Sequence, residues 1–279
     1  MHKIALNNEL LIPEIGFGVF EIPDGKATED AVRAAIHTGY RLIDTAAVYG
    51  NEAAVGEAIH TAGVPREELF ITTKVWNDDI RKGTVKQAFE ESLAKLGLDY
   101  VDLYLIHWPA EGWQQAWRDL QDLYASGRAK AIGVSNFERH HLEALLDAPT
   151  TEVVPAVDQV ESSPQFPNTD LVDFCKSRGI VVEAYKPLGG HEGVAALSGD
   201  RRLRDVGEKY GKSPAQVALR WQLQRGVIPL PKSTRETRIV QNYHVFDFEL
   251  SPEDMAVVDS VAGTDGGRRN GSDPDNFDF

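Results

Sequence analysis

The sequence predicts an α/β protein in which eight strand-and-helix units close into a (β/α)8 barrel of the TIM-barrel type. Three observations support this fold. The 279 residues suit one barrel of roughly 250 residues, apolar runs of strand length recur eight times, and amphipathic helical stretches separate them. Strands that alternate with helices pair in parallel; eight would close a barrel, whereas five or six would leave an open sheet. We therefore expect one domain spanning residues 1–279.

The elements follow in order from the N-terminus. Two short apolar segments around Asn7-Asn8-Glu9, at 3–6 and 10–12, predict a hairpin that caps the barrel. Eight short apolar runs then predict the barrel strands, at residues 15–18, 41–44, 69–74, 101–107, 131–135, 156–160, 180–185 and 227–231.

Helices are expected between these strands. Apolar residues three and four positions apart predict them at 31–37, 85–96 and 142–146, among other stretches. Ser213 and Gln216 form a capping-box pattern with Pro214 in the first turn, so another helix should begin there. The Gly-, Asp- and Arg-rich segment 264–279 is expected to be either a frayed tail or a flap over the barrel mouth.

Composition excludes several classes of function. A net charge of −14 and a pI near 5.0 argue against nucleic-acid and anionic-membrane partners, which require clustered cations. Cys175 is the only cysteine, so an intrachain disulfide and a thiolate zinc cage are impossible. No signal-peptide pattern or 18-residue apolar stretch is present. We expect a cytoplasmic monomer that acts on a small molecule without a metal ion.

Four polar residues fall where barrels carry their chemistry, at or just after the carboxyl ends of strands. Asp44, Lys74 and His107 end the second, third and fourth predicted strands, and Tyr49 lies in the loop after the second. Neighbouring strands lie roughly 5 Å apart, so these side chains should converge. An isolated Asp–Lys pair or histidine is often structural, but four compatible groups on consecutive strand ends favour a catalytic site.

These four groups suit proton delivery to a carbonyl. The phenol of Tyr has a pKa of about 10, and an ammonium about 4 Å away favours the phenolate by roughly 4 kcal/mol. Lys74 could thus lower the pKa of Tyr49 by up to ~3 units, before the cost of desolvating the lysine itself is counted. Asp44 would keep Lys74 charged, and His107 would hydrogen-bond the carbonyl oxygen. The hydride must come from a cofactor.

A phosphate site is expected after the eighth strand, because no complete Rossmann glycine motif is present. Ser233 and Glu236 form a capping-box pattern, so a helix with free N–H groups should begin there. Lys232, Arg235 and Arg238 add positive charge to an acidic protein. This cluster could bind the cofactor phosphate, or it could be a solvated basic patch.

Six segments, in order across nearly the whole chain, resemble the aldo-keto reductases: DTAAVYGNE (44–52), FITTKVW (70–76), VDLYLIHWP (101–109), IGVSNF (132–137), VEAYKPLG (182–189) and IPLPKST (228–234). The likeness is greatest to the prokaryotic branch that includes the 2,5-diketo-D-gluconate reductases. It implies reduction of aldehydes and ketones by hydride from C4 of NADPH, which would lie across the carboxyl ends of the strands. It also implies that Tyr49 is the general acid, that Lys74 and Asp44 tune it, and that His107 orients the substrate.

The resemblance implies further contacts, position by position. Those to the cofactor are Ser135, Asn136 and Gln159 at the carboxamide, Tyr185 on the nicotinamide ring, Pro187 and Leu188 along the pyrophosphate, Lys232, Ser233, Thr234 and Arg238 around the 2′-phosphate, and Gln241 and Asn242 at the adenine. Those that would line the substrate slot are Phe20, Val48, Trp76 and Trp108, with Trp113 from the following loop.

Several positions depart from the family pattern. Phe20 replaces a frequent tryptophan and the loop at 110–113 is short, which suggests a wide slot for small aldehydes, α-dicarbonyls and keto-sugars. Gln241 replaces an acidic residue near the adenine. Asp158 and Lys186 replace an asparagine and a serine near the ends of adjacent strands, and their opposite charges predict an ion pair beside the cofactor channel.

Three other functions use parts of the same pattern. Lys74 could form a Schiff base, as in barrel aldolases. The barrel could instead be a non-catalytic NADPH-binding sensor or accessory protein, although the intact set of four polar residues argues against this. A metal-dependent hydrolase would need more ligands, because His107 has no H-x-H partner and His140-His141 lie in a helical stretch.

Overall fold

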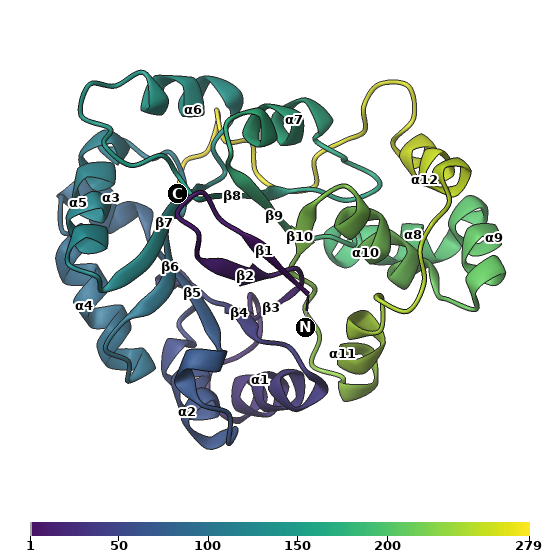
Figure 1. Ribbon diagram of the computed structural model, residues 1–279, viewed down its shortest axis with the longest axis horizontal. Coiled ribbons are helices and arrows are strands. Elements are labelled where there is room, and N and C mark those ends of the chain that lie inside the picture. Colours follow the sequence, from purple (N-terminus) through teal and green to yellow (C-terminus); the bar gives the residue numbers. More distant parts are fainter. Residues whose placement is uncertain (1) are drawn as a thin grey trace.

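The computed structural model of the protein describes residues 2–279, apart from the side chain of Glu192. Eight parallel strands form one sheet that curls into a nearly closed barrel (Figure 1). In the order of the chain they are β3 (Gly16–Gly18), β4 (Leu42–Asp44), β5 (Phe70–Val75), β6 (Val101–Ile106), β7 (Ala129–Ser135), β8 (Val157–Glu161), β9 (Val181–Tyr185) and β10 (Val227–Pro229). The N–H of Gly18 donates to the carbonyl of Pro231 at 3.2 Å, which links the first and last strands. The predicted fold and all eight strands are confirmed.

The expected N-terminal hairpin is also present. β1 (Lys3–Ala5) and β2 (Leu11–Pro13) pair antiparallel with Ile4 opposite Ile12. In Figure 1 the hairpin lies across the centre of the ring of strands. Leu6 and Ile12 are buried with the apolar side chains of the barrel interior, so the hairpin closes the amino-terminal end of the barrel.

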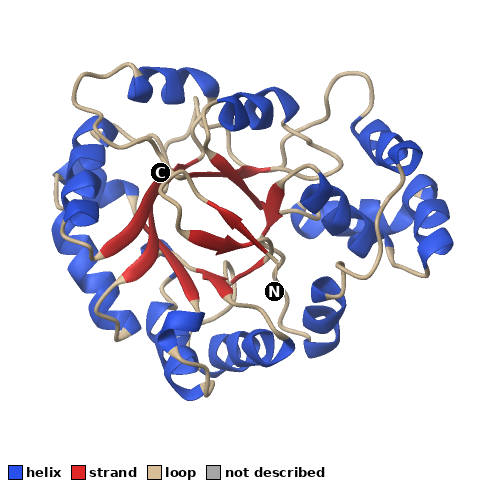
Figure 2. Cartoon of the chain, in the orientation of Figure 1, coloured by secondary structure: helices blue, strands red, loops and turns tan. Residues whose placement is uncertain are grey.

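Helices surround the strands on the outside (Figure 2). The described residues form α1 (Lys26–Thr38), α2 (Glu52–Thr61), α3 (Asn77–Lys82), α4 (Val85–Leu96), α5 (Trp113–Ala125), α6 (Arg139–Leu146), α7 (Thr169–Ser177), α8 (Gly190–Gly199), α9 (Arg201–Tyr210), α10 (Pro214–Gln224), α11 (Glu236–Tyr243) and α12 (Pro252–Asp259). Three short 3-10 turns add η1 (Ala47–Tyr49), η2 (Arg66–Glu68) and η3 (Ser260–Ala262). The expected helices correspond to α1, α4 and α6, and Ser213 caps α10 with the predicted capping box.

The count of eight helices was too low. α3 lies between β5 and α4, α8 and α9 are inserted between β9 and α10, and α12 follows α11. The apolar faces of α9, α10 and α12 pack together around Trp221 and Leu203, as a cluster distinct from the main core. α8, α9 and α12 lie to one side of the barrel in Figure 1.

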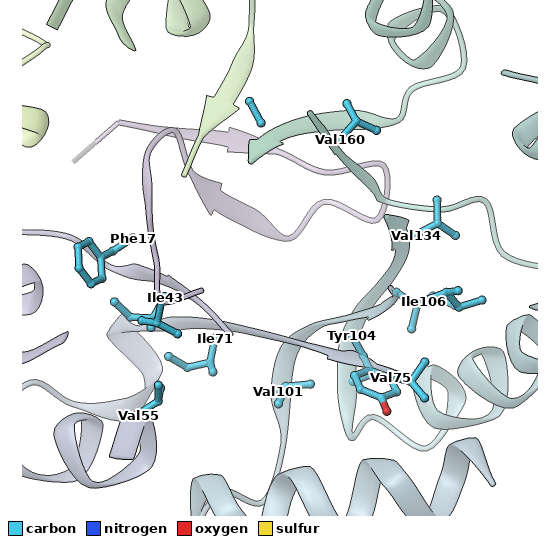
Figure 3. Close-up of a cluster of buried hydrophobic side chains, with 14 of the residues drawn as sticks. Phe17, Ile43, Val55, Ile71, Val75, Val101, Tyr104, Ile106, Val134 and Val160 are labelled. Atoms are coloured by element: carbon cyan, nitrogen blue, oxygen red, sulfur yellow. The ribbon is translucent and has the colours of Figure 1, made fainter. Parts of the chain in front are cut away.

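Two apolar layers position the strands. Inside the barrel, Leu42, Leu103, Val157 and Ile228 are buried together. Gly16 belongs to this layer because a Cβ there would come within 2.5 Å of the Leu230 side chain. The alternate residues of each strand point outward and pack under the helices, including those drawn in Figure 3: Phe17, Ile43, Ile71, Tyr104, Ile106, Val134 and Val160. The interior is therefore filled, and only the carboxyl ends of the strands are left for a site.

The C-terminal segment forms the flap that was one of the two expectations. The backbone N–H groups of Asn270 and Gly271 donate to the two carboxylate oxygens of Glu161, at 2.7 and 2.6 Å. Arg269 pairs with Glu138. Glu161 ends β8, so these contacts hold the segment at the carboxyl ends of the strands.

Candidate active site

The fold brings the four predicted catalytic residues together. Asp44 is the last residue of β4, Lys74 the penultimate residue of β5, and His107 directly follows β6. Tyr49 ends η1, the 3-10 turn after β4. Lys74, Asp44 and His107 are buried, whereas Tyr49 keeps partial exposure. The parallel strands thus deliver three groups to one edge, and the turn returns the phenol above them.

Lys74 is the centre of the hydrogen-bond network. Its ammonium donates to Asp44 Oδ1 at 2.7 Å and to the carbonyl of Thr45 at 2.9 Å. The third contact is with the phenol oxygen of Tyr49 at 3.4 Å. The side chain is fully buried, so its charge acts in a low-dielectric environment.

Burial and charge oppose each other in this network. Burial would lower the pKa of Lys74, but the charge and hydrogen bond of Asp44 outweigh it, and the net pKa is raised. Lys74 therefore stays protonated. Burial raises the pKa of Tyr49, and the neighbouring Lys74 offsets only part of that rise. Desolvation of the phenolate thus exceeds the attraction of the ammonium, and the net pKa of Tyr49 lies above its ordinary value.

The protonation states of Tyr49 and His107 allow Tyr49 to act as a general acid. Tyr49 holds its proton at neutral pH, and Lys74 stabilises the phenolate that forms when the proton leaves. Burial lowers the pKa of His107 well below its ordinary value, and Lys74 adds to this effect. His107 is therefore a neutral imidazole, which can donate one hydrogen bond. Its Nδ1 is buried without a partner among the described residues.

Aromatic rings surround these groups. The ring of Tyr49 meets the ring of His107 edge-on at 5.7 Å, and Trp76 meets His107 at 5.2 Å. Phe20 packs on Tyr49 at 5.0 Å. The phenol and imidazole thus face a region with apolar walls.

The residues predicted at the carboxamide also converge. Ser135 Oγ donates to the carbonyl of Gln159 at 2.7 Å, and Asn136 Nδ2 donates to the carbonyl of His107 at 3.0 Å. The hydroxyl of Tyr185 donates to Asn136 Oδ1 at 2.7 Å. Gln159 Nε2 donates to Asp44 Oδ2 at 2.8 Å, so this group is linked directly to Asp44 and Lys74.

Comparison with known proteins agrees with this geometry. The model of the aldo/keto reductase family matches residues 14–262. The chain belongs to the aldo-keto reductase family. It is 48% identical to a glyoxal reductase of Bacillus subtilis (strain 168), with 99% of this chain and 97% of that enzyme covered. It is 40% identical to the methylglyoxal reductase DkgA of Escherichia coli (strain K12), with 98% and 97% covered.

A solved structure supports the fold as well. The crystal structure of an aldo-keto reductase from a Medee basin deep-sea metagenome library superposes with a TM-score of 0.94. The two sequences are 42% identical, and each chain is covered over 100% of its length. The family and relatives establish this chain as an oxidoreductase of carbonyl compounds.

The predicted phosphate corner differs in detail from expectation. α11 begins at Glu236 with Arg235 as its N-cap residue, so the helix starts later than the Ser233–Glu236 pattern predicted. Ser233 instead accepts a hydrogen bond from the N–H of Arg235 at 3.0 Å, because the chain makes a local serine turn before the helix. Lys232, Thr234 and Arg238 are exposed here, as is Gln241, whereas Ser233 and Asn242 are buried.

The donor set fits a nicotinamide dinucleotide phosphate. Exposed cations at the start of α11 suit a phosphate, and the amides of Asn136 and Gln159 suit a carboxamide. Tyr185, at the end of β9, offers an aromatic face between these two regions, with Pro187 and Leu188 in the turn that follows. Among the described residues, Lys232 makes only a loose ion pair with Glu21, at 3.9 Å, so its charge remains available.

The proposed Asp158–Lys186 ion pair is wrong. Gln159 points into the barrel, so its neighbour Asp158 points outward, where it is buried near the thiol of Cys175 at 4.0 Å. Lys186 lies instead at the mouth, with its side chain beside Gly190 and Gly271. The strand register separates the two charges, because Asp158 lies opposite Val182 and Lys186 follows the end of β9, four residues further along the chain.

The predicted slot residues fall into two groups. Phe20 and Val48 are exposed at the mouth, and Trp76 and Trp108 stand at the ends of β5 and β6. Trp113 packs edge-on against Phe137 in the main core, at 5.2 Å, and a contact of Trp113 with substrate stays a prediction.

The C-terminal flap adds aromatic side chains to the predicted slot, a contribution that was not predicted from the sequence. Phe279 stacks on Trp76 at 5.7 Å and meets Trp108 at 5.1 Å. Phe277 also packs on Trp108, at 5.1 Å. Asn77 Nδ2 and Arg81 Nη2 donate to the backbone oxygen of Phe279 at 3.1 and 2.8 Å, which fixes the last turn of the flap. The paired phenylalanines in an otherwise polar tail were the available signal.

Proposed function

We propose that the protein reduces small aldehydes, α-dicarbonyls and keto-sugars with NADPH, and that Tyr49 is the general acid. The observation that carries this proposal is the contact of Tyr49 with the buried ammonium of Lys74, at 3.4 Å, which is itself held by Asp44. When bound, NADPH supplies the hydride. The relatives named above are a glyoxal reductase and a methylglyoxal reductase, which supports α-dicarbonyls as the substrate class.

Each residue of the site has a distinct role in the proposed reaction. His107 donates a hydrogen bond to the carbonyl oxygen and orients it toward Tyr49, which transfers its proton to that oxygen as negative charge develops. Lys74 stabilises the phenolate that remains, and Asp44 keeps Lys74 charged. Trp76, Trp108 and Phe20 exclude water and hold the apolar part of the substrate.

Cofactor choice would be set by the basic corner at α11. Lys232 and Arg238, with the hydroxyls of Ser233 and Thr234, would hold the 2′-phosphate, and charge-assisted bonds of ~1.5–3 kcal/mol each favour NADPH over NADH. Gln241 and Asn242 would face the adenine. A monomeric state and a cytoplasmic location stay predictions from the composition.

The test is oxidation of NADPH, followed at 340 nm, with methylglyoxal, phenylglyoxal and 2,5-diketo-D-gluconate. We expect turnover with at least one of them and weaker activity with NADH. Tight NADPH binding without any turnover would favour the sensor function instead. Borohydride trapping of a substrate on Lys74 would favour Schiff-base chemistry, which the raised pKa of this lysine opposes.

A further inference from the structure

A second carboxyl group lies inside the barrel beside the candidate active site. Glu183, the middle residue of β9, is fully buried. It stands directly opposite Gln159 in the parallel pairing of β8 and β9, so both side chains point to the same face. The proposed mechanism assigns Glu183 no role, although a buried carboxyl group is costly unless something compensates for it.

The amide of Gln159 bridges Glu183 to the catalytic pair. Gln159 Nε2 donates one hydrogen to Glu183 Oε2 and the other to Asp44 Oδ2, both at 2.8 Å. Asp44 Oδ1 in turn accepts from Lys74 at 2.7 Å. With both N–H bonds directed at carboxyl groups, the Gln159 amide has one preferred orientation, and its oxygen is left as the acceptor for a ligand amide.

We infer that Glu183 is a positioning residue, which orients the Gln159 amide so that its oxygen accepts from the nicotinamide carboxamide while its nitrogen holds Asp44 against Lys74. This inference rests on the proposed function. Without an acceptor at position 183, one N–H of Gln159 would lack its partner, and the amide could rotate. Both cofactor affinity and proton delivery would then suffer together.

The charges around Glu183 add a pH dependence. The groups that face it are Asp44 from β4, Lys74 from β5 and the neutral amide of Gln159 from β8, whereas its partner on β10 is Ile228. Burial, with the negative charge of Asp44, raises the pKa of Glu183 to about 8. Below that pH Glu183 is neutral, and the negative charge of Asp44 is balanced by the positive charge of Lys74. Above it, a second negative charge makes Tyr49 a weaker acid, so the kcat for reduction should fall.

The experiment compares E183L, E183Q and the control D158N in the full-length protein. Asp158 is a buried acid on the neighbouring strand that faces outward, so D158N should bind NADPH like the wild type. E183L should weaken NADPH binding, measured by fluorescence quenching, by at least about fivefold. E183Q keeps an acceptor oxygen and should lose about twofold. The E183L protein should melt close to the wild type, because removal of a buried ionisable group offsets the loss of the acceptor for Gln159.

The pH profile gives the second readout. The wild type and D158N should lose activity through about pH 8, and E183Q should lack that step, since its amide does not ionise. Unchanged NADPH affinity in E183L would overturn the inference. Equal losses in E183L and E183Q together with lowered melting temperatures would also overturn it, because they would show a purely structural role.

A cofactor-independent measurement separates this inference from the proposed function. Melting temperatures of Q159M, E183L and the double variant report the contact between the two side chains. Additive changes would overturn the inference whether or not NADPH binds. Non-additive changes in a protein that binds no NADPH would overturn the proposed function and the nicotinamide part of the inference, and would leave the Glu183–Gln159–Asp44 link standing.

Discussion

Removal of the Lys74 charge, as in Lys74→Met, tests how Tyr49 is made an acid. The ammonium lies 3.4 Å from the phenol oxygen. At an effective dielectric constant near 20, it favours a full negative charge on that oxygen by about 5 kcal/mol. If about half of that charge has formed in the transition state, the loss is about 2.5 kcal/mol, on the order of 10²-fold in kcat.

The same substitution leaves Asp44 buried without its partner, so it should also destabilise the fold by about 3–5 kcal/mol. The double variant Asp44→Asn, Lys74→Met removes both charges and separates the two effects. Urea denaturation should show near wild-type stability for the double variant, and turnover at 340 nm should still be lost. A Lys74→Met protein within about threefold of wild-type kcat, or recovery of activity along with stability in the double variant, would refute the electrostatic role.

Three further outcomes follow from the geometry. Burial raises the pKa of Asp158 well above its ordinary value, so the folded state favours the protonated carboxyl group. The stability that this preference contributes is present below about pH 4 and is lost as the pH rises through the folded-state pKa. Asp158→Asn should therefore increase the free energy of unfolding at pH 8 by about 1–2 kcal/mol, and a decrease in urea titrations at pH 8 would contradict this. Because His107 is neutral, its pKa being held well below the ordinary value, kcat should vary by less than about twofold from pH 5.5 to 7; an acid limb near pH 6.5 would show the assignment to be wrong. Lys232→Ala and Arg238→Ala should each reduce kcat/KM for NADPH by about tenfold and leave the value for NADH unchanged, whereas equal losses with both cofactors would place the phosphate elsewhere.

The strands could be predicted from sequence because each is an apolar run between turn residues. The carboxyl ends of these strands then indicated where the site lies. Asp44, Lys74 and His107 each stand at the carboxyl end of such a run, so closure of the barrel made their convergence predictable. Tyr49 was found because η1 is short and returns the chain directly over β4.

Other features depended on burial that sequence does not show directly. The net pKa of Tyr49 could not be derived from the sequence, because the desolvation of its phenolate depends on how completely the barrel mouth covers it. Glu183 was missed, although the strand period of two places it on the inward face with Tyr185. The Asp158–Lys186 pair is excluded by the register of β8 and β9, which sets Asp158 opposite Val182 and which the sequence does not show. Phe277 and Phe279 belong to a flap whose path is set by Glu161, a long-range contact without a local signal.

The central claim is that Tyr49 delivers the proton. The most direct measurement is single-turnover oxidation of bound NADPH by methylglyoxal in wild type and Tyr49→Phe, with NADPH affinity measured separately by fluorescence quenching. We expect Tyr49→Phe to bind NADPH within about threefold of wild type and to lose at least about 10²-fold in the rate of the chemical step. Turnover in Tyr49→Phe close to the wild-type rate would contradict the account, because the acid would then be another group.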